Sequence, residues 1–429
     1  MSYLQFNDYY KSLVRSGRMP VPYPYYYPYN SRTPNLSNQD CENKIFCAGE
    51  DYIFDRLYDY NANCANYADH SVNNLSCIDN NSYYDKYDYC AYGLTPYQDP
   101  ACAMGFTIQK IVSNIPLLAR NLDVNALDPW GIMIVRDVVW VANTGSGLIT
   151  SYDLLGRPLL PVINVFGPLI NIAQPTGIVF NCDIFAFPIW CGPINGPSNI
   201  LIATRDGTIN GYNFDIDPDN SILLIDNSND NCVYTGLAIY ETTLYVADFY
   251  NQKIDVYNGL LEKIKIFPFV DECLDDPMPP DFAPFNVVNI CDLIYVTYAK
   301  QNPFDNQFQF PGIGNGYVNI FTLGGIFVKR FVSRGVLNTP WGLTLIPSWF
   351  GYPAGSIMIS NFGDGTINIF DSCGKYLGAM RDGCNNNICI EGIRGLANNP
   401  NYDRVLYWTC SANNLRDAFV GTIYTRSII

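Results

Sequence analysis

The stretch ISNFGDGTINIFD, residues 359–371, consists of two runs of β-forming residues separated by a tight turn. In the second run, Ile367 and Ile369 alternate with residues that point the other way, which is the pattern of a strand with one buried side. Gly363 and Gly365 supply the positive φ angles that a tight hairpin requires. The stretch therefore predicts a β-hairpin.

The same layout recurs along the chain. Each copy has an apolar strand, a polar turn and a second strand that closes on or next to an aromatic residue. The clear copies are WVANTGSGLITSYD (140–153), LIATRDGTINGYN (201–213) and LYVADFYNQKIDVYN (244–258). Looser copies lie at 293–323, around an insertion, and at 404–425. A repeated hairpin indicates a repeat architecture rather than one large sheet.

A tripeptide that usually begins with proline and usually ends with glycine precedes each hairpin. The six copies are Pro129-Trp130-Gly131, Pro175-Thr176-Gly177, Tyr234-Thr235-Gly236, Pro284-Phe285-Asn286, Pro340-Trp341-Gly342 and Ile393-Arg394-Gly395. Recurrence about every fifty residues is typical of propeller blades. The sequence therefore predicts an all-β, six-bladed β-propeller. The alternative is a β-sandwich with chance similarities.

The last blade offers only three strands, near 393–397, 404–410 and 419–426, whereas residues 105–113 form an alternating strand ahead of the first blade. A propeller closes well when one terminus donates the missing strand to the blade of the other, because both sheet edges are then hidden. We therefore expect residues 105–113 to be the outer strand of the last blade.

Composition divides the chain into three parts: a Pro/Tyr-rich tail at 1–34, a Cys/Tyr/Asn-rich module at 35–104 and the propeller at 105–429. Within the tail, MPVPYPYYYPYNSRTP (19–34) alternates proline with tyrosine and has Arg32 as its only charge. Proline favours the polyproline II conformation, and tyrosine buries a large ring while its hydroxyl stays hydrated. We expect the tail to lie extended on a protein surface; a disordered tail is the alternative.

The net charge of −15 makes nucleic acid a poor direct partner, because phosphate neutralisation supplies most non-specific affinity for DNA and RNA. No run of eighteen apolar residues occurs, so no membrane span is expected. The amino-terminal residues lack the continuous apolar core of a secretory signal.

Fifteen cysteines suggest disulfides rather than zinc, because no CxxC pair exists and His70 is the only histidine. We expect six of them to pair largely among themselves in the amino-terminal module: Cys41, Cys47, Cys64, Cys77, Cys90 and Cys102. Cys182–Cys191 and Cys384–Cys389 are predicted as local bridges of the propeller. A particle or compartment with its own thiol oxidation would reconcile these bridges with the missing signal.

Residues 105–429 resemble an uncharacterised family of NHL-like six-bladed propellers found in bacteria and in giant DNA viruses of amoebae. The resemblance rests on segments such as VANTGSG, PTGIVF, LYVADFYNQKIDVY, PWGLTL and SNFGDGTINIFD, which agree in order and spacing. It implies the fold and no particular activity, and it does not cover residues 1–104. The Asn- and Tyr-rich composition and the cysteines without a signal resemble a giant-virus protein.

Without a histidine in the propeller, a Ser-His-Asp triad or a histidine-bound transition metal is excluded there. A calcium site of carboxylates and amides is the remaining alternative, and gluconolactonase-like propellers place such an ion in the central channel. The candidate ligands are Asn143, Asp248, Asn286, Asn361 and Glu391. The competing interpretation is that these side chains make turns. The acidic loop 271–276 is either a second cation site or a solvated linker.

The sequence thus favours a non-enzymatic structural or interaction protein without a cofactor. We expect a component of a giant-virus particle whose amino-terminal extension contacts other subunits, including its own copies. The alternative function is a calcium-dependent lactonase or esterase-like hydrolase, and the alternative location is extracellular. Trp130 and Trp341 are expected to pack between blades rather than to stack on a ligand.

Overall fold

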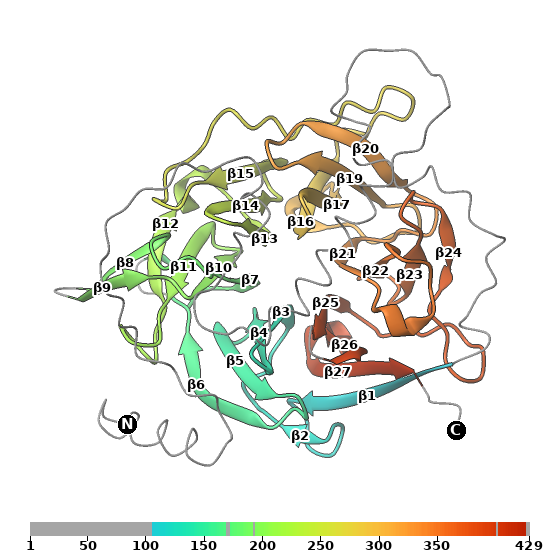
Figure 1. Cartoon of the computed structure of the whole chain (residues 1–429), viewed down its shortest axis with the longest axis horizontal. Coiled ribbons are helices and arrows are strands. Elements are labelled where there is room, and N and C mark those ends of the chain that lie inside the picture. The colour runs from blue at the N-terminus through green and yellow to red at the C-terminus, as the bar shows by residue number, and fades with distance from the viewer. Residues whose placement is uncertain (1–104, 169–171, 192–193, 400–401, 426–429) are drawn as a thin grey trace, which may run out of the picture. The chain divides into compact units, whose positions relative to one another are not determined.

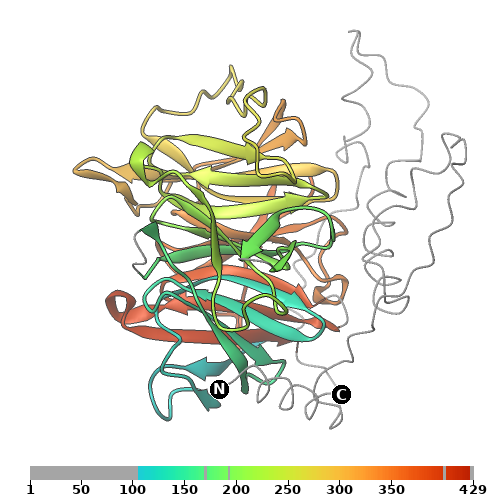
Figure 2. The same cartoon turned by 90° about the vertical axis from the view of Figure 1, so that its left-hand side faces the viewer.

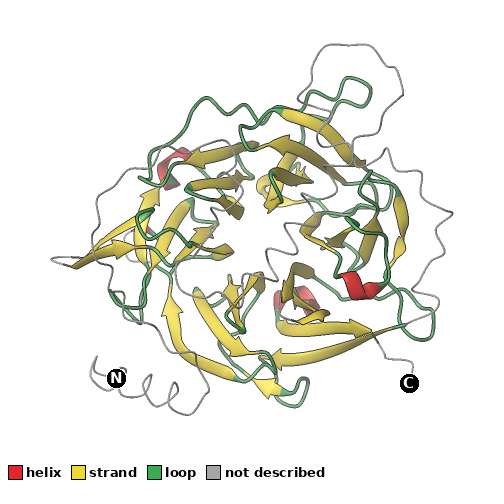
Figure 3. Cartoon of the chain, viewed as in Figure 1, coloured by secondary structure: helices red, strands yellow, loops and turns green. Residues whose placement is uncertain are grey.

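A computed structural model describes residues 105–168, 172–191, 194–399 and 402–425. In this part of the chain, six sheets surround a central axis as the blades of a propeller, and strands and loops make up nearly all of it (Figures 1 and 3). The predicted six-bladed fold is therefore confirmed. The tail at 1–34 and the module at 35–104, with its six cysteines and His70, lie outside the described residues.

Blades one to three follow the chain in order. Blade one is β3 (Pro129–Val135), β4 (Val138–Asn143), β5 (Leu148–Asp153) and β6 (Pro158–Asn164). Blade two is β7 (Pro175–Phe180), β10 (Ile200–Thr204), β11 (Thr208–Tyr212) and β12 (Ile222–Asp226), and between β7 and β10 stands the hairpin of β8 (Pro188–Cys191) and β9 (Ile194–Pro197). Blade three is β13 (Tyr234–Tyr240), β14 (Thr243–Asp248) and β15 (Lys253–Tyr257). Beyond β15, a single antiparallel bridge joins Tyr257 to Lys263.

Blades four to six complete the ring. Blade four is β16 (Phe282–Ile290), β17 (Leu293–Asn302), β19 (Gly316–Thr322) and β20 (Phe327–Ser333), and β18 (Asp305–Gln309) in its insertion pairs with the end of β17. Blade five is β21 (Pro340–Leu345), β22 (Ile357–Asn361), β23 (Ile367–Phe370) and β24 (Tyr376–Ala379). Blade six is β25 (Ile393–Asn399), β26 (Tyr402–Ser411) and β27 (Asp417–Thr425), followed by β1 (Phe106–Ser113) and β2 (Asn121–Leu122).

The first and last described strands lie side by side in blade six. β1 runs antiparallel to β27, with Phe106 opposite Thr425 and Ser113 opposite Phe419. On its other edge β1 pairs in parallel with β2. β27 consequently has a strand on both edges, β26 on one and β1 on the other. Residues 105–113 were expected beside the last strand of this blade, and β1 lies there.

The core lies between neighbouring blades, where alternate residues of each sheet face the next sheet. One cluster joins blades five and six through Met358, Ile369, Leu406 and Trp408, all without exposed surface. Figure 2 shows the ring of sheets from the side. This packing of sheet on sheet is the main source of stability in such a fold.

Steric crowding explains why the blade-start tripeptide usually ends with glycine. A Cβ atom on Gly131 would lie 2.5 Å from the carbonyl oxygen of Thr176 at the start of the next blade. A Cβ atom on Gly342 would lie 2.1 Å from the carbonyl oxygen of Arg394. Because the inner strands crowd around the axis, only glycine lets neighbouring backbones approach this closely.

Candidate functional site

Hydrogen bonds between successive blade starts account for one predicted metal ligand. Asn286 donates from Nδ2 to the carbonyl oxygen of Trp341 at 3.0 Å. Thr176 likewise donates to the carbonyl oxygen of Tyr234 at 2.9 Å, and Thr409, on β26 of blade six, donates to the carbonyl oxygen of Trp130 at 2.6 Å. Asn286 therefore takes part in a series of bonds that link one blade to the next.

Three further candidates, Asn143, Asp248 and Asn361, close the second strand of blades one, three and five. Asn143 donates to Thr150 Oγ1 at 2.9 Å, within its own hairpin. Asp248 and Asn361 instead accept from the backbone just before their blade starts, at 3.1 Å and 3.0 Å, respectively. Their equivalent positions and local bonds are those expected of turn-forming side chains.

The fifth candidate, Glu391, accepts a hydrogen bond from the backbone N–H of Asn413 at 2.9 Å. Among the described residues, one group of Cys, Asp, Glu or His side chains is compact enough to hold an ion, and of the five candidates it contains only Asp248. Asp248 and Glu391, the two carboxylates among the five candidates, therefore do not belong to one compact group.

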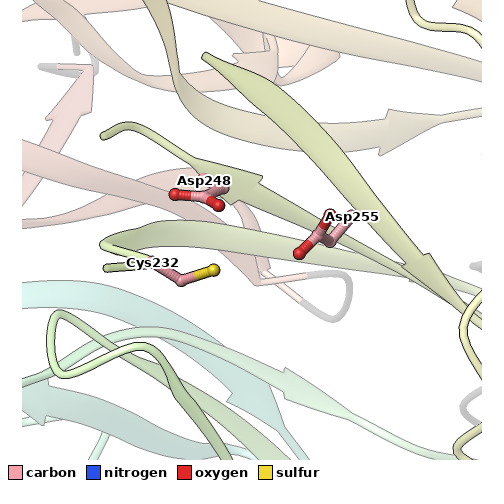
Figure 4. A group of neighbouring side chains, drawn as sticks. All are labelled: Cys232, Asp248 and Asp255. Atoms are coloured by element: carbon pink, nitrogen blue, oxygen red, sulfur yellow. The ribbon is translucent and has the colours of Figure 1, made fainter. Parts of the chain in front are cut away.

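That compact group consists of Cys232, Asp248 and Asp255, whose candidate ligand atoms lie within 4.8 Å of one another (Figure 4). All three side chains are buried in blade three. Burial, followed by the bond to Asp248, raises the pKa of the Cys232 thiol to about 12. The thiol is therefore protonated at neutral pH when no ion is bound.

Two lysines already neutralise the carboxylates of this group. Lys253 Nζ lies 3.4 Å from Asp248 Oδ2 and 3.1 Å from Asp255 Oδ1, and Lys263 Nζ lies 2.9 Å from the same Asp255 oxygen. Burial alone would lower the pKa of Lys253, but Asp255 and Asp248 raise it. Tyr234 also donates to Asp255, at 2.9 Å. The arrangement is a satisfied buried polar network.

The acidic loop 271–276 is likewise paired with cationic partners. Arg330 Nη2 lies 2.7 Å from Asp271 Oδ2, and Arg330 Nη1 lies 3.2 Å from Asp276 Oδ2. Asn319 also donates to Asp271. These bonds hold the loop on blade four, so the interpretation of the loop as a solvated linker is wrong for Asp271. The guanidinium of Arg330 occupies the position beside Asp271 and Asp276 that a bound cation would take.

Aromatic side chains from the blade starts meet at the centre of the propeller. The ring of Trp130 lies 6.0 Å from the rings of both Phe285 and Trp341, and Phe249 lies 5.2 Å from Phe285, measured between centroids. With Ala283 and Ala299 they form one buried cluster, which we call the central aromatic cluster. Trp341 Nε1 donates to the carbonyl oxygen of Thr235 at 2.9 Å.

Three of these contacts join blades that are not neighbours: one with four, one with five, and five with three. Trp130 and Trp341 were expected to pack between blades. They pack against each other across the axis rather than between neighbouring blades. Trp130 and Trp341 are 2% and 4% exposed, respectively. Their faces are consequently in contact with protein groups rather than open to a ligand.

Charged residues surround Trp130 within this centre. The guanidinium of Arg394, at the start of blade six, lies 4.2 Å from the Trp130 ring. Arg394 Nη1 lies 2.8 Å from Asp128 Oδ1, and Trp130 Nε1 donates to the other oxygen of Asp128 at 3.1 Å. Burial lowers the pKa of Arg394 and Asp128 opposes that shift. An arginine remains charged at neutral pH even so.

The insertion of blade four reaches blade two. Arg205, in the turn after β10, donates to the carbonyl oxygen of Gln307 at 3.2 Å, and its guanidinium lies 4.5 Å from the ring of Phe308. The same guanidinium lies 6.0 Å from the Trp130 ring. The β18 insertion therefore bridges two blades that are not neighbours, close to the central aromatic cluster.

The predicted Cys384–Cys389 bridge is wrong, because both thiols are free and exposed. Asp382 accepts from the backbone N–H groups of Cys384 and Asn386, each at 2.9 Å, which fixes a turn. The backbone of Cys389 instead forms an isolated antiparallel β-bridge with the backbone of Thr366. Backbone bonds to different partners thus hold the two cysteines in separate places.

The other predicted propeller bridge is only partly described. Cys182 is disulfide-bonded, and the side chain of Cys191 lies outside the described set. Cys291 and Cys373 are also disulfide-bonded, which the sequence reasoning did not anticipate. Cys232 and Cys410 are free and buried.

Sequence reasoning also missed Asp128, Asp255 and Arg205. One signal was available: Arg394 occupies the middle of its tripeptide, where Trp130 and Trp341 stand in theirs. A lone charge in a series of apolar and small residues points to a buried partner. Nothing near Asp128 in the sequence identified it as that partner.

The fold and this centre define a class: six-bladed β-propellers whose axis is filled by aromatic side chains. "Uncharacterized protein R640" of Acanthamoeba polyphaga mimivirus is 34% identical to this chain over 99% of each protein. "Uncharacterized protein L690" of the same virus is 35% identical, over 78% of this chain and 90% of that protein. The chain therefore belongs to the giant-virus propeller family that these mimivirus proteins represent.

No protein-family model matches the sequence. Among solved structures, a streptogramin B lyase has a TM-score of 0.47 at 12% identity, covering 76% of this chain and 99% of the lyase. Likeness at this level says nothing about activity. Within the described residues, no helix is long and apolar enough to span a membrane.

Proposed function

We propose that the protein is a non-enzymatic structural and interaction component of a giant-virus particle. In this proposal the propeller is a rigid platform, and the amino-terminal extension contacts other protein subunits, including further copies of the chain. The observation that carries the proposal is the central aromatic cluster. The blades of a propeller surround a central channel, and here Trp130, Phe249, Phe285 and Trp341 bury their rings against each other where the blade starts meet.

Three further observations support the proposal. The propeller contains no histidine. Among the described residues, the buried carboxylates Asp128, Asp248 and Asp255 are each paired with a lysine or an arginine, and the fourth, Asp123, accepts a hydrogen bond from Tyr152. A relative that matches 99% of the chain comes from a giant virus.

Large apolar side chains stand in solvent on the loops and insertions. Phe304 in the blade-four insertion is 94% exposed, Leu274 in the linker before blade four is 92% exposed, and Phe185 beside the β8–β9 hairpin is 84% exposed. Apolar side chains that project from separate loops offer contact points to a protein partner. They favour an interaction role over a free monomeric enzyme.

The test is quantitative mass spectrometry of particles purified from infected cells. The chain is expected in washed particles in amounts comparable to other structural proteins. A virus that encodes the chain without residues 1–34 is expected to lose the protein from its particles while the lysate level stays the same. Abundant chain in the lysate and none in washed wild-type particles would reject the proposal.

A further inference from the structure

The β8–β9 hairpin presents an apolar groove to solvent. The groove has a volume of about 210 Å³ and is lined by Ile184, Phe185, Pro188, Trp190, Asn195, Gly196 and Pro197. Trp190 is 69% exposed and Phe185 is 84% exposed. None of the lining residues carries a charge, on a chain whose net charge is −15. Two wide-open aromatic rings beside one pocket are unusual on a solvent face.

The groove is firmly held by the propeller. Phe187 and Ile189 have no exposed surface, so the residues that alternate with Pro188 and Trp190 are anchored in the core. Phe187 donates from its backbone N–H to the Gly259 carbonyl oxygen of blade three at 2.6 Å. Asn213 donates to the carbonyl oxygen of Pro197, also at 2.6 Å. The exposed rings are therefore held on a rigid support before any ligand arrives, which lowers the entropy cost of binding.

Exposed aromatic rings with an adjacent amide are the chemistry that recognises proline-rich extended peptides. A polyproline II segment has no internal hydrogen bonds, so its carbonyl groups can accept from a side chain such as Asn195. The chain itself contains a segment of this kind: MPVPYPYYYPYN, residues 19–30, with four prolines, five tyrosines and no charge. Tyrosine and proline are suited to packing on Trp190 and Phe185.

We propose that this groove receives residues 19–30 of a neighbouring copy of the chain. The proposal rests on the proposed function, because it names the surface to which the amino-terminal extension docks in the assembly. Residues 31–104 separate this segment from the propeller of its own chain. The groove and the segment are both uncharged, so no ion has to be desolvated when they come into contact.

Photocrosslinking in the full-length protein tests the docking. Tyr25 is replaced by benzoylphenylalanine in chains of natural isotope composition, which are mixed with ¹⁵N-labelled wild-type chains under conditions in which copies associate. After irradiation, mass spectrometry is expected to find cross-links from position 25 of the unlabelled chain to residues 184–197 of the labelled chain. Sedimentation of the same sample scores association independently.

Two groove variants and a matched control complete the experiment. Trp190→Ala and, separately, Phe185→Ala in the labelled chain are expected to reduce the cross-link yield at least tenfold. Trp349→Ala removes another exposed aromatic ring, between β21 and β22 of blade five, and is expected to leave the yield unchanged. The thermal transition of each variant verifies that the propeller is folded. If one of the two groove variants fails to fold, the other still tests the proposal.

The outcomes separate the two proposals. Association with cross-links to other surfaces, or with cross-links confined to a single isotope, overturns the docking proposal and leaves the assembly function in place. Association with a yield that neither groove variant reduces also overturns the docking proposal. Wild-type chains that do not associate with one another or with other particle proteins overturn both.

Discussion

Arg394 and Asp128 form a buried ion pair at 2.8 Å between the start of blade six and the residue that precedes blade one. They are 266 positions apart in the sequence. The side chain of Arg394 is 1% exposed and lies between the rings of Trp130 and Phe362, at 4.2 Å and 4.4 Å. The pair therefore joins the two ends of the ring near the axis, while β1 and β27 join them at the periphery.

Replacing Arg394 by alanine is expected to destabilise the propeller by about 3–5 kcal/mol. The change leaves the carboxylate of Asp128 without its cationic partner in a buried site, which is the costly way to break such a pair. Urea unfolding followed by circular dichroism gives the free energy of unfolding. The control is Arg157→Ala, which removes an exposed pair with Asp153 and is expected to cost about 0–1 kcal/mol. Equal stability of the two variants would contradict the role assigned to Arg394.

Calcium is expected to leave the stability of the protein unchanged. The carboxylates that could bind it, Asp248, Asp255 and Asp271, are already paired with Lys253, Lys263 and Arg330. A site filled at about 100 times its Kd would add about 2.7 kcal/mol, which differential scanning fluorimetry with calcium or with EDTA detects. A calcium-dependent rise in Tm that Asp248→Asn abolishes would revive the hydrolase alternative.

Free cysteines are expected to react with iodoacetamide at very different rates. Cys384 and Cys389 are exposed, whereas Cys232 and Cys410 are buried and burial raises the pKa of each of these two thiols to about 12. At pH 8 a thiol of pKa about 12 is thiolate in about one molecule in 10⁴. Peptide mapping of the native protein should show alkylation at the exposed pair at least about tenfold faster, and the difference should vanish in denaturant. Fast native alkylation of Cys232 would contradict the buried network of blade three.

The blades are predictable because each one is encoded locally. The Asp-Gly turns of ISNFGDGTINIFD and LIATRDGTINGYN place Gly365 and Gly207 at φ of +77° in both cases, as the sequence of such turns requires. The glycine of the blade-start tripeptide has a similar local signature. The fourth strand of blade three is the exception: residues 263–267 alternate like a strand, yet only one bridge forms.

The centre of the propeller is not predictable in the same way, because its partners come from separate blades. Nothing near Asp128 in the sequence indicates Arg394, and nothing near Trp341 indicates Thr235. The asparagines and aspartates singled out as metal ligands illustrate the same limit. An oxygen-bearing side chain at a strand end has the same sequence pattern whether it binds an ion or the backbone, and only its hydrogen bonds distinguish the two roles.

Alkaline pH is expected to destabilise the protein through its buried tyrosines. Burial raises the pKa of Tyr245 and of Tyr257 to about 12, and burial together with Asp255 raises the pKa of Tyr234 still further. In the unfolded chain these phenols ionise near pH 10. Above that pH the unfolded state releases protons that the folded state retains, so stability is full below pH 10 and is lost as the pH rises towards 12.

The measurement is Tm between pH 8 and pH 11 together with phenolate absorbance at 295 nm. The fall in Tm above pH 10 should be smaller in Tyr245→Phe than in the wild type, because that variant has one fewer raised pKa. The change in Tm with pH is compared rather than Tm itself, because the variant also loses the hydrogen bond from Tyr245 to the Leu323 carbonyl oxygen at every pH. A Tm that is constant up to pH 11 would show that these phenols are not buried.

Closure of the ring by β1 predicts a sharp difference between two truncations. Without residues 1–104, β1 remains and can cover β27, so the propeller is expected to stay folded and soluble. Without residues 1–114, the edge of β27 from Phe419 to Thr425 loses every partner that β1 supplies. An uncovered edge in the middle of an apolar blade pairs readily with other chains, and aggregation is the expected result. Size-exclusion chromatography with light scattering compares the two proteins at equal concentration. Equal solubility would mean that β27 does not depend on β1, and that the contacts of Arg394 and Trp130 at the axis suffice to close the ring.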